Sequence, residues 1–270
     1  MKRIAWLTDI HLNVLPQNNI EKFCRTIAAG NAAYSPDVVV ISGDIAEAAS
    51  VAADLEAMAA CLRLPIYFVL GNHDFYGSSI ANTCEHIRQT CRQSRYLRWL
   101  SGREVYELTP TVGLVGDGLW ADGRSGDYQK SELLLNDYFL IEDLAKLNKQ
   151  ERWEKLKALG DAAAQRCREI LPKALAKYRQ VFFISHVPPF RQACFYLGKP
   201  SDGADLAHFC CQAAGEVLRD IMTQHPQHQL IVLSGHTHEC ADVEILPNLR
   251  VLVGSAEYGD PVVQYLFEIE

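Results

Sequence analysis

The sequence predicts an α/β fold organised around a parallel sheet. Short runs rich in Val, Ile, Leu and Phe recur along the chain and end at Gly, Ser, Asp or His, as strands buried on both faces do. Two Ala-rich stretches with helical spacing, at 20–34 and 48–62, separate the first three runs. The order β-α-β-α-β is typical of parallel strands joined by right-handed helical crossovers. The runs predicted as strands are 3–7, 37–41, 66–70, 181–184 and 229–233.

The other elements follow in chain order. Ser35-Pro36 and Leu64-Pro65 end the first two helices, because proline disfavours helical backbone in the residue before it. A helix is expected over 79–92, and strands over 105–108 and 111–115 are joined at a Thr-Pro turn. Three further strands are expected to complete a second sheet: 241–246, 250–254 and 262–269.

The middle of the chain contains a loop followed by helices. Residues 117–129 hold three glycines and three aspartates, which predicts a loop. Residues 131–178 have a helical pattern with breaks near 136–137 and 160–161, and Pro172 is expected to kink a helix over 162–177. Because long connections in compact domains usually carry function, we expect 117–160 to be a capping insertion that favours small substrates.

Length and composition indicate one domain and exclude several classes of protein. No repeat, low-complexity tract or linker divides the 270 residues, so a single domain over 1–270 is expected. The net charge of −7 makes a partner such as long nucleic acid unexpected, since that binding depends on clustered Lys and Arg. The apolar run 4–7 is too short for a signal peptide, and no run reaches the roughly 18 residues of a membrane span. We therefore expect a soluble, cytoplasmic protein that does not bind membranes.

Nine cysteines occur without a C-x-x-C pair. In a reducing compartment they are expected to be small buried side chains rather than metal or redox sites. Cys210-Cys211 is the one adjacent pair.

Polar segments directly follow, or end, the apolar runs, and five of the nine histidines lie in them. The carboxyl ends of strands are where ligands gather in open α/β sheets, and imidazole, carboxylate and carboxamide are ligands for divalent metals. Together these segments offer more donors than one metal requires, enough for two metals that share a bridging ligand. The segments are Asp9-Ile10-His11, Gly43-Asp44, Gly71-Asn72-His73-Asp74, Ser185-His186 and Gly235-His236-Thr237-His238.

The spacing within the segments supports convergence of the side chains. Asp9 and His11 are two residues apart, so both can point the same way in an extended stretch, and His236 and His238 repeat that spacing. Gly43 lets the backbone turn closely and direct Asp44 at the sheet edge.

In order and composition these segments resemble the calcineurin-like metallophosphoesterase superfamily, with its D-x-H, G-D-x-x-[DE], G-N-H-[DE], H and G-H-x-H blocks. The matching blocks span residues 9 to 238. The resemblance implies a four-layer α/β/β/α sandwich with two mixed sheets, as in metallo-dependent phosphatases. It also implies a hydrolase of phosphate esters, either a phosphodiesterase or a phosphatase.

The resemblance assigns two divalent metal ions to seven residues. Asp9, His11, Asp44 and His238 would hold one metal, and Asp44, Asn72, His186 and His236 the other. Asp44 would bridge the two, since a carboxylate has two oxygens and offsets cationic charge. Such a pair clamps a phosphate and provides a metal-bound hydroxide for in-line attack. The ligand types suit Mn, Fe and Zn alike.

His73 and Asp74 are the predicted catalytic residues. By resemblance His73 would face the substrate, bind its phosphate and protonate the leaving group. Asp74 could accept a hydrogen bond from this imidazole and keep it cationic.

A bacterial subgroup with G-N-H-[DE]-F-Y-G, L-W-x-D and N-D-Y blocks is also similar, at residues 71–77, 119–122 and 136–138. Phe75 and Tyr76 are expected to pack the loop rather than stack on a substrate ring. Asp122 and Asp137 could line the mouth of the site. Glu47 has two open readings, orientation of a ligand or a solvated position at a helix start.

Other polar residues are interpreted as surface groups. The remaining histidines, His86, His208, His225 and His228, are expected at the surface. The basic residues nearest the site, Arg124, Lys130 and Arg191, are expected to be solvated charges rather than phosphate ligands.

Three functions remain open, and the sequence favours a hydrolase of small phosphate esters. Protein Ser/Thr phosphatases have phosphate-gripping arginines in G-D-x-V-D-R-G and R-G-N-H-E, which 43–47 and 70–74 lack. A small-molecule or nucleotide ester is therefore the expected substrate. The alternatives are a noncatalytic metal-binding scaffold, which should have lost ligands, and a nuclease, which should have a basic groove.

Overall fold

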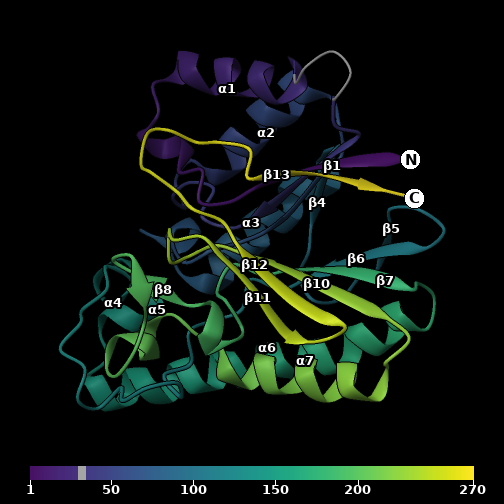
Figure 1. The fold of residues 1–270 in the computed structure, drawn as a ribbon. Helices are drawn as coiled ribbons and strands as arrows, with labels where there is room; N and C mark the ends of the chain where they lie inside the picture. Colours follow the sequence, from purple (N-terminus) through teal and green to yellow (C-terminus); the bar gives the residue numbers. More distant parts are fainter. Residues whose placement is uncertain (30–34) are drawn as a thin grey trace.

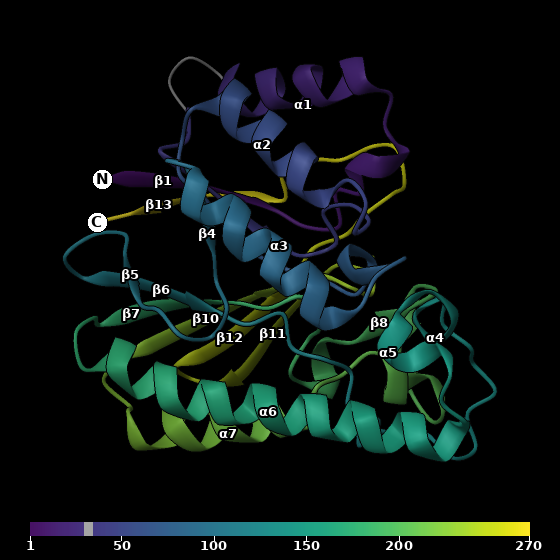
Figure 2. The same ribbon diagram turned by 180° about the vertical axis from the view of Figure 1, so that it is seen from behind.

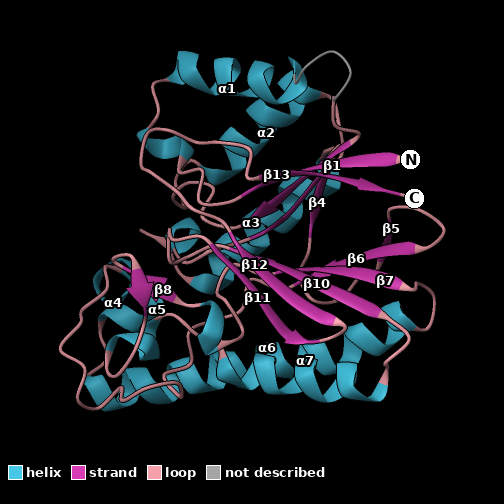
Figure 3. Ribbon diagram, in the orientation of Figure 1, coloured by secondary structure: helices cyan, strands magenta, loops and turns pink. Residues whose placement is uncertain are grey.

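Two β-sheets pack face to face, and helices cover both outer faces (Figures 1 and 3). The computed structural model describes residues 1–29 and 35–270. The layers confirm the predicted α/β/β/α sandwich. The amino and carboxyl termini lie side by side at one end of the first sheet (Figure 1).

The first sheet has the strand order β13-β1-β2-β3-β4. Four strands are parallel: β1 (Lys2–Leu7), β2 (Val38–Ser42), β3 (Ile66–Val69) and β4 (Leu97–Trp99). The edge strand β13 (Tyr265–Ile269) pairs antiparallel with β1. The helices on the outer face of this sheet (Figure 2) are α1 (Gln17–Ala29), α2 (Val51–Leu62) and α3 (Ile80–Gln93).

The second sheet has the order β11-β12-β10-β7-β6-β5. Its parallel centre consists of β6 (Val112–Gly116), β7 (Gln180–Ile184), β10 (Gln229–Ser234) and β12 (Leu249–Val253). The antiparallel edges are β5 (Tyr106–Glu107) and β11 (Ala241–Leu246). The long helix α6 (Lys149–Leu175) and α7 (Gln212–Gln224) cover its outer face (Figure 2). Short elements beside this sheet are α4 (Asp137–Leu140), α5 (Glu142–Ala145), β8 (Phe195–Tyr196) and β9 (Lys199–Pro200).

Alternate residues of the strands supply different cores. In β1, Ala5 and Leu7 pack toward the helices, whereas Ile4 and Trp6 belong to the cluster between the two sheets. Because successive side chains of a strand point to opposite faces, a strand with both faces buried must be apolar throughout. The apolar runs of the sequence therefore predicted these strands to within one or two residues.

The last strand pairs differently from the prediction. Residues 262–269 were expected in the second sheet, but β13 is shorter and pairs with β1 of the first. Its Phe267 ring contacts Phe182 across the sheets, with centroids 5.2 Å apart, and Ile269 is buried in the same cluster. Strand β4 was not predicted.

Helix α6 also differs from the prediction, because it runs through Gly160-Asp161 without a break. A Cβ at Gly160 would lie 2.6 Å from Cβ of Asp122, so the glycine permits close approach of the loop rather than ending the helix. Pro172 lies in the last turn of α6. Residues 131–136 are not helical, and positions 30–34 of the first predicted helix lie outside the described residues.

No helix in the described part of the chain is long and apolar enough to cross a membrane.

Candidate functional site

The predicted donors converge at one edge of the two sheets. Asp9 follows β1, Asp44 follows β2 and Asn72 follows β3, while His186 and His236 follow β7 and β10 of the other sheet. Because the strands within each sheet are parallel, their carboxyl ends meet at one edge. The sandwich therefore brings residues from both sheets into one cluster.

One half of the cluster contains Asp9, His11, Asp44 and His238, whose donor atoms all lie within 4.8 Å of one another. His11 Nε2 lies 3.3 Å from His238 Nε2 and 4.0 Å from Asp44 Oδ2. His238 Nε2 lies 3.4 Å from Asp9 Oδ1. Asp9 is held in place by the Thr8 hydroxyl and the His236 backbone amide, which both donate to its carboxylate.

The other half contains Asp44, Asn72, His186 and His236. Asn72 Oδ1 lies 2.9 Å from His186 Nε2 and 2.9 Å from His236 Nδ1. Asp44 Oδ1 lies 3.3 Å from His186 Nε2. The two oxygens of Asp44 thus face different halves, which is the geometry expected of a bridging ligand.

Hydrogen bonds on the far side of two imidazoles direct their free nitrogens inward. His186 Nδ1 lies 3.0 Å from the Ser42 carbonyl, and His236 Nε2 lies 3.0 Å from the His208 carbonyl. As each of these nitrogens donates its proton to a carbonyl, the inward nitrogens, 3.2 Å apart, are the ones left to bind a metal: His236 presents a lone pair there, and His186 does so once a metal displaces its inward proton. Asn72 adds a third acceptor there. Two imidazole nitrogens and one amide oxygen thus converge on one point, so the donor set fits a divalent metal.

Burial and the charges of neighbouring groups set the pKa values in the cluster. Burial is the largest influence on the pKa of His186 and lowers it, but Asp44 and Asp9 together raise it to about 9. Burial also opposes ionisation of Asp44, yet the histidines around it hold its pKa well below the ordinary value. Burial lowers the pKa of His11 to about 4. The field of the carboxylates therefore favours a positive charge at the centre of the cluster.

Backbone strain is concentrated on these ligands. Among the described residues, eight other than glycine have positive φ, and five of them are Asp9, His11, Asp44, His236 and His238. Positive φ is costly for such residues and persists where the surroundings fix it, commonly at functional sites. Close backbone approach adds to the constraint, since a Cβ at Gly71 would lie 2.1 Å from Asp44 Oδ1.

His73 lies at the rim of the cluster rather than inside it. Its side chain is 19% exposed, and Nε2 lies 3.8 Å from Asp44 Oδ2. The Tyr76 ring stacks on the imidazole, with centroids 4.3 Å apart. Solvent therefore reaches this ring, and its role toward a substrate stays a prediction.

Asp74 does not have the predicted contact with His73. Its buried carboxylate accepts hydrogen bonds from the backbone amides of Ile45, Ala46 and Gly71, at 2.8 to 2.9 Å. Burial and the charge of Asp44 raise the pKa of Asp74 to about 8. The residue ties the loop after β3 to the loop after β2, because amides buried there need an acceptor. Its role is therefore to position the ligand loops.

Asp137 is buried behind Asn72, where it lines a small cavity of about 20 Å³ beside His236 rather than an open mouth. Its Oδ1 accepts hydrogen bonds from Asn72 Nδ2, at 2.8 Å, and from the Tyr76 hydroxyl, at 2.6 Å. Because Asn72 Nδ2 donates to Asp137 and, at 3.3 Å, to the Tyr76 hydroxyl, the Asn72 oxygen is turned toward His186 and His236. The N-D-Y block of the sequence thus orients a candidate ligand.

His208 was expected at the surface and is buried. Its ring nitrogens contact the Ser131 and Tyr138 hydroxyls, at 2.8 and 2.5 Å, and its carbonyl accepts from His236. Burial lowers the pKa of His208 to about 4, so the ring is neutral. Residues 131–138 cover it, which sequence patterning did not reveal. His86 is exposed as predicted, and His225 and His228 are half-buried.

Tyr258 is a candidate that the sequence analysis missed. This exposed ring lies 4.4 Å from the His11 ring, 5.2 Å from that of His238 and 6.3 Å from that of His73, measured between centroids. It follows β12 by five residues, in a loop without a metal-binding motif. Its place beside three imidazoles makes it a wall of the site.

The other candidate residues pack against or pair with neighbouring parts of the protein. Phe75 and Tyr76 are buried and pack the loop, as expected. Asp122 is fully buried and accepts from the Arg124 guanidinium and the Ala213 amide, so it does not line a mouth either. Arg124 also pairs with Asp161.

Several residues lie at the surface. The exposed Glu47 matches the reading of a solvated position before α2, and Lys130 and Arg191 are exposed as well. All nine cysteines are free, and five of them are buried, including Cys210 and Cys211.

Comparison of the sequence with models of known protein families finds a match to one family. The family model described as calcineurin-like phosphoesterase matches residues 2–240. A curated relative from Bos taurus, a transmembrane protein with metallophosphoesterase domain, is 37% identical over 86 residues, which are 30% of this chain and 18% of that protein. The chain thus matches under a fifth of that relative's length.

Solved structures share the fold. The phosphopantetheinyl hydrolase from Mycobacterium tuberculosis has a TM-score of 0.65 at 15% identity, with 95% of this chain and 90% of that chain covered. A dimetal phosphatase from Danio rerio has a TM-score of 0.56 at 13% identity, with 94% and 87% covered.

Proposed function

Because the chain belongs to the calcineurin-like phosphoesterase family, we propose that it is a dinuclear metal-dependent hydrolase of small phosphate esters. The observation that carries the proposal is the position of Asp44, whose two oxygens face separate clusters of His, Asp and Asn donors. A scaffold that had lost catalysis should have lost donors, and all seven predicted ligands are brought together.

Seven residues would hold the two metals. Asp9, His11, Asp44 and His238 would bind one, and Asp44, Asn72, His186 and His236 the other. When bound, two divalent ions acidify a water molecule and offset the charge of a phosphate during in-line displacement. Mn, Fe and Zn all suit this donor set.

The residues at the rim would act on the substrate. His73 Nε2 is close to Asp44 but partly exposed, so it can contact a phosphate oxygen and donate a proton to the leaving oxygen. Tyr76 fixes the plane of this imidazole by stacking. Tyr258 provides an aromatic face over which an organic leaving group can pass.

Charge favours a small substrate over a nucleic acid. The chain has a net charge of −7, and the guanidinium of Arg124 is engaged by Asp122 and Asp161. A nuclease needs a basic groove to neutralise phosphates along a strand. The predicted cap over 117–160 also favours small esters. It contains Asp137, which orients Asn72. The nine free thiols support the expected cytoplasmic location.

A substrate panel on the metal-stripped protein tests the proposal. Aryl phosphate monoesters and diesters are incubated with the chain before and after addition of Mn²⁺, Fe²⁺ or Zn²⁺. Turnover that appears only with metal supports the hydrolase, and the ratio of diester to monoester rates assigns the preference. Absence of turnover with every metal and ester would contradict it.

Metal binding is expected to stabilise the fold independently of activity. A ligand that binds only the folded chain at 100 times its Kd adds about 2.7 kcal/mol to the free energy of unfolding. Thermal unfolding of the metal-stripped chain with and without Mn²⁺ measures this as a rise in Tm. The Asp9→Asn variant should show a smaller rise, whereas an unchanged Tm in the wild type would contradict a metal site.

The Asp137→Ala variant is expected to bind the metal of the Asn72 half about 10 to 100 times more weakly, because Asn72 loses the acceptor that orients its amide. Calorimetric titration with Mn²⁺ should resolve one weakened metal site and one unchanged metal site. Asp137→Asn should restore part of the affinity, since it keeps an acceptor oxygen. Glu142→Ala, at an exposed position nearby, is the control. Equal affinities in all variants would exclude this role.

A further inference from the structure

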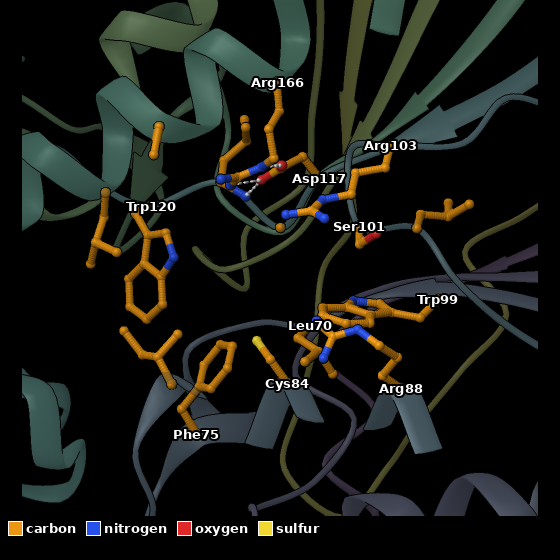
Figure 4. Close-up of a pocket in the computed structure, with 16 residues that line it drawn as sticks. Leu70, Phe75, Cys84, Arg88, Trp99, Ser101, Arg103, Asp117, Trp120 and Arg166 are labelled. Carbon is orange, nitrogen blue, oxygen red and sulfur yellow. Dashed lines mark hydrogen bonds and ion pairs between the residues drawn. The ribbon is translucent and has the colours of Figure 1, made fainter. Parts of the chain in front are cut away.

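A cavity of about 240 Å³ lies beside the metal-binding cluster (Figure 4). Its walls come from α3 and the segment after β4 on one side, and from the loop after β6 and α6 on the other. None of the seven candidate ligands, nor His73 or Tyr258, lines it. Leu70, Phe75, Leu119 and Trp120 also line a smaller cavity of about 20 Å³ beside Asn72 and His236, so a ligand bound here would occupy a site that adjoins the metal-binding cluster without containing its ligands.

The lining of this cavity is cationic in an acidic protein. Three guanidiniums, of Arg88, Arg103 and Arg166, face one carboxylate, that of Asp117. Three positive charges and one negative charge leave +2 among the lining residues, or +1 when the Glu85 that pairs with Arg88 is included, whereas the whole chain has −7. A local charge opposite to that of the chain concentrates small anions.

The three arginines are engaged to different degrees. Arg166 binds Asp117 through two nitrogens, so its charge is largely offset. Arg88 pairs with the exposed Glu85 and lies over the Trp99 ring, with Cζ 5.6 Å from the centroid. Arg103 is exposed and forms no ion pair with the other residues drawn in Figure 4. Arg103 is therefore the guanidinium available to an incoming anion.

Aromatic surface accompanies this charge. Trp99, Ser101 and Arg103 occupy alternate positions of one segment, so an indole, a hydroxyl and a guanidinium are presented together (Figure 4). At the other end, Trp120 packs on Phe75 with ring centroids 5.4 Å apart, and Leu70 lies between the two ends. A ligand that satisfies both kinds of surface needs an apolar planar body and an anionic group.

We propose that this cavity binds a small organic anion with a single planar ring, whose ring stacks on the face of Trp99 opposite Arg88 and whose phosphate, phosphonate or carboxylate oxygens contact Arg103 and Ser101. A guanidinium matches such oxygens with paired hydrogen bonds, and an indole gives a face for stacking. The volume limits the ligand to about one ring, since sites for larger organic ligands usually measure about 300 to 1,000 Å³.

Calorimetric titration of the full, metal-stripped chain with phenylphosphonate tests this proposal. The phosphonate has no ester bond, so binding is measured without hydrolysis, and without metal the result does not depend on the proposed enzyme activity. We expect one site per chain. Arg103→Ala should weaken it at least tenfold, as should Trp99→Leu. Arg92→Ala is the matched control, since Arg92 is exposed on α3 one turn beyond Arg88 and does not line the cavity.

Matched ligands separate the two parts of the proposal. Cyclohexylphosphonate keeps the anionic group without a planar ring, and inorganic phosphate lacks the organic body. Both should bind at least tenfold more weakly than phenylphosphonate. Equal binding of all three would overturn the proposal, and so would a loss on Arg92→Ala as large as that on Arg103→Ala. Thermal unfolding of each variant verifies that it is folded, and Arg103→Lys distinguishes loss of paired hydrogen bonds from loss of charge.

Discussion

The Asp44→Asn variant is expected to lose turnover by about a thousandfold or more and to bind both metals weakly. Asp44 is the residue whose oxygens face both halves of the site, with Oδ1 3.3 Å from His186 Nε2 and Oδ2 4.0 Å from His11 Nε2. The substitution keeps the size of the side chain but removes the negative charge between two cations. A bridging anion contributes several kcal/mol to such a centre, and each 1.4 kcal/mol is about tenfold in rate.

Two measurements on one preparation test this expectation. Metal content is determined by mass spectrometry after equilibration with Mn²⁺, and turnover is followed with an aryl phosphate ester. Asp220→Asn, at an exposed position on α7, is the control and should match the wild type in both. If Asp44→Asn retained two metals per chain with wild-type turnover, the bridging role would be wrong.

The ligands could be predicted from the sequence because their signal is local. Each lies within four residues of the end of a buried strand, and both the strand and the donor are readable in one short segment. The parallel order then brings those ends to one edge. The bridging role of Asp44 was instead implied by the family resemblance, which puts this carboxylate in both ligand sets.

Residues that act through tertiary contacts could not be predicted in the same way. His208 is in a polar turn, Asp205–His208, that is typical of surfaces, and only its cover by Ser131 and Tyr138 buries it. Asp137 lies far from any strand end in sequence, and Tyr258, five residues after β12, lies in a loop without a metal-binding motif. The pairing of β13 with β1 likewise depends on where the chain returns in space, which a strand pattern does not encode.

Asp74 shows a different reason for a wrong prediction. A carboxylate adjacent to His73 in sequence is a plausible partner for that imidazole, but the local turn directs it to buried amides of two loops. An unsatisfied buried amide costs roughly 1 to 3 kcal/mol, so the backbone is a strong competitor for the carboxylate. Adjacency along the chain does not decide which donor an acceptor meets.

The His73→Ala variant separates metal binding from catalysis. We expect it to bind both metals as the wild type does, because its ring is at the rim and the two halves of the cluster are complete without it. Turnover should fall by about 10² to 10⁴, the usual contribution of a positioned acid–base group. The two effects can be measured on the same samples by metal analysis and ester hydrolysis, with His86→Ala at an exposed helical position as the control.

The leaving group decides whether His73 is a proton donor or only a phosphate ligand. If the imidazole protonates the leaving oxygen, the loss in His73→Ala should be large for an alkyl ester and small for a nitrophenyl ester, which leaves without a proton. If His73 only binds the phosphate, its loss should instead lower kcat/KM equally for both substrates, mainly by raising KM. A variant with the full wild-type rate on the alkyl ester at every pH would exclude both roles, and the rim histidine would then only pack against Tyr76, on which it stacks, and Tyr258.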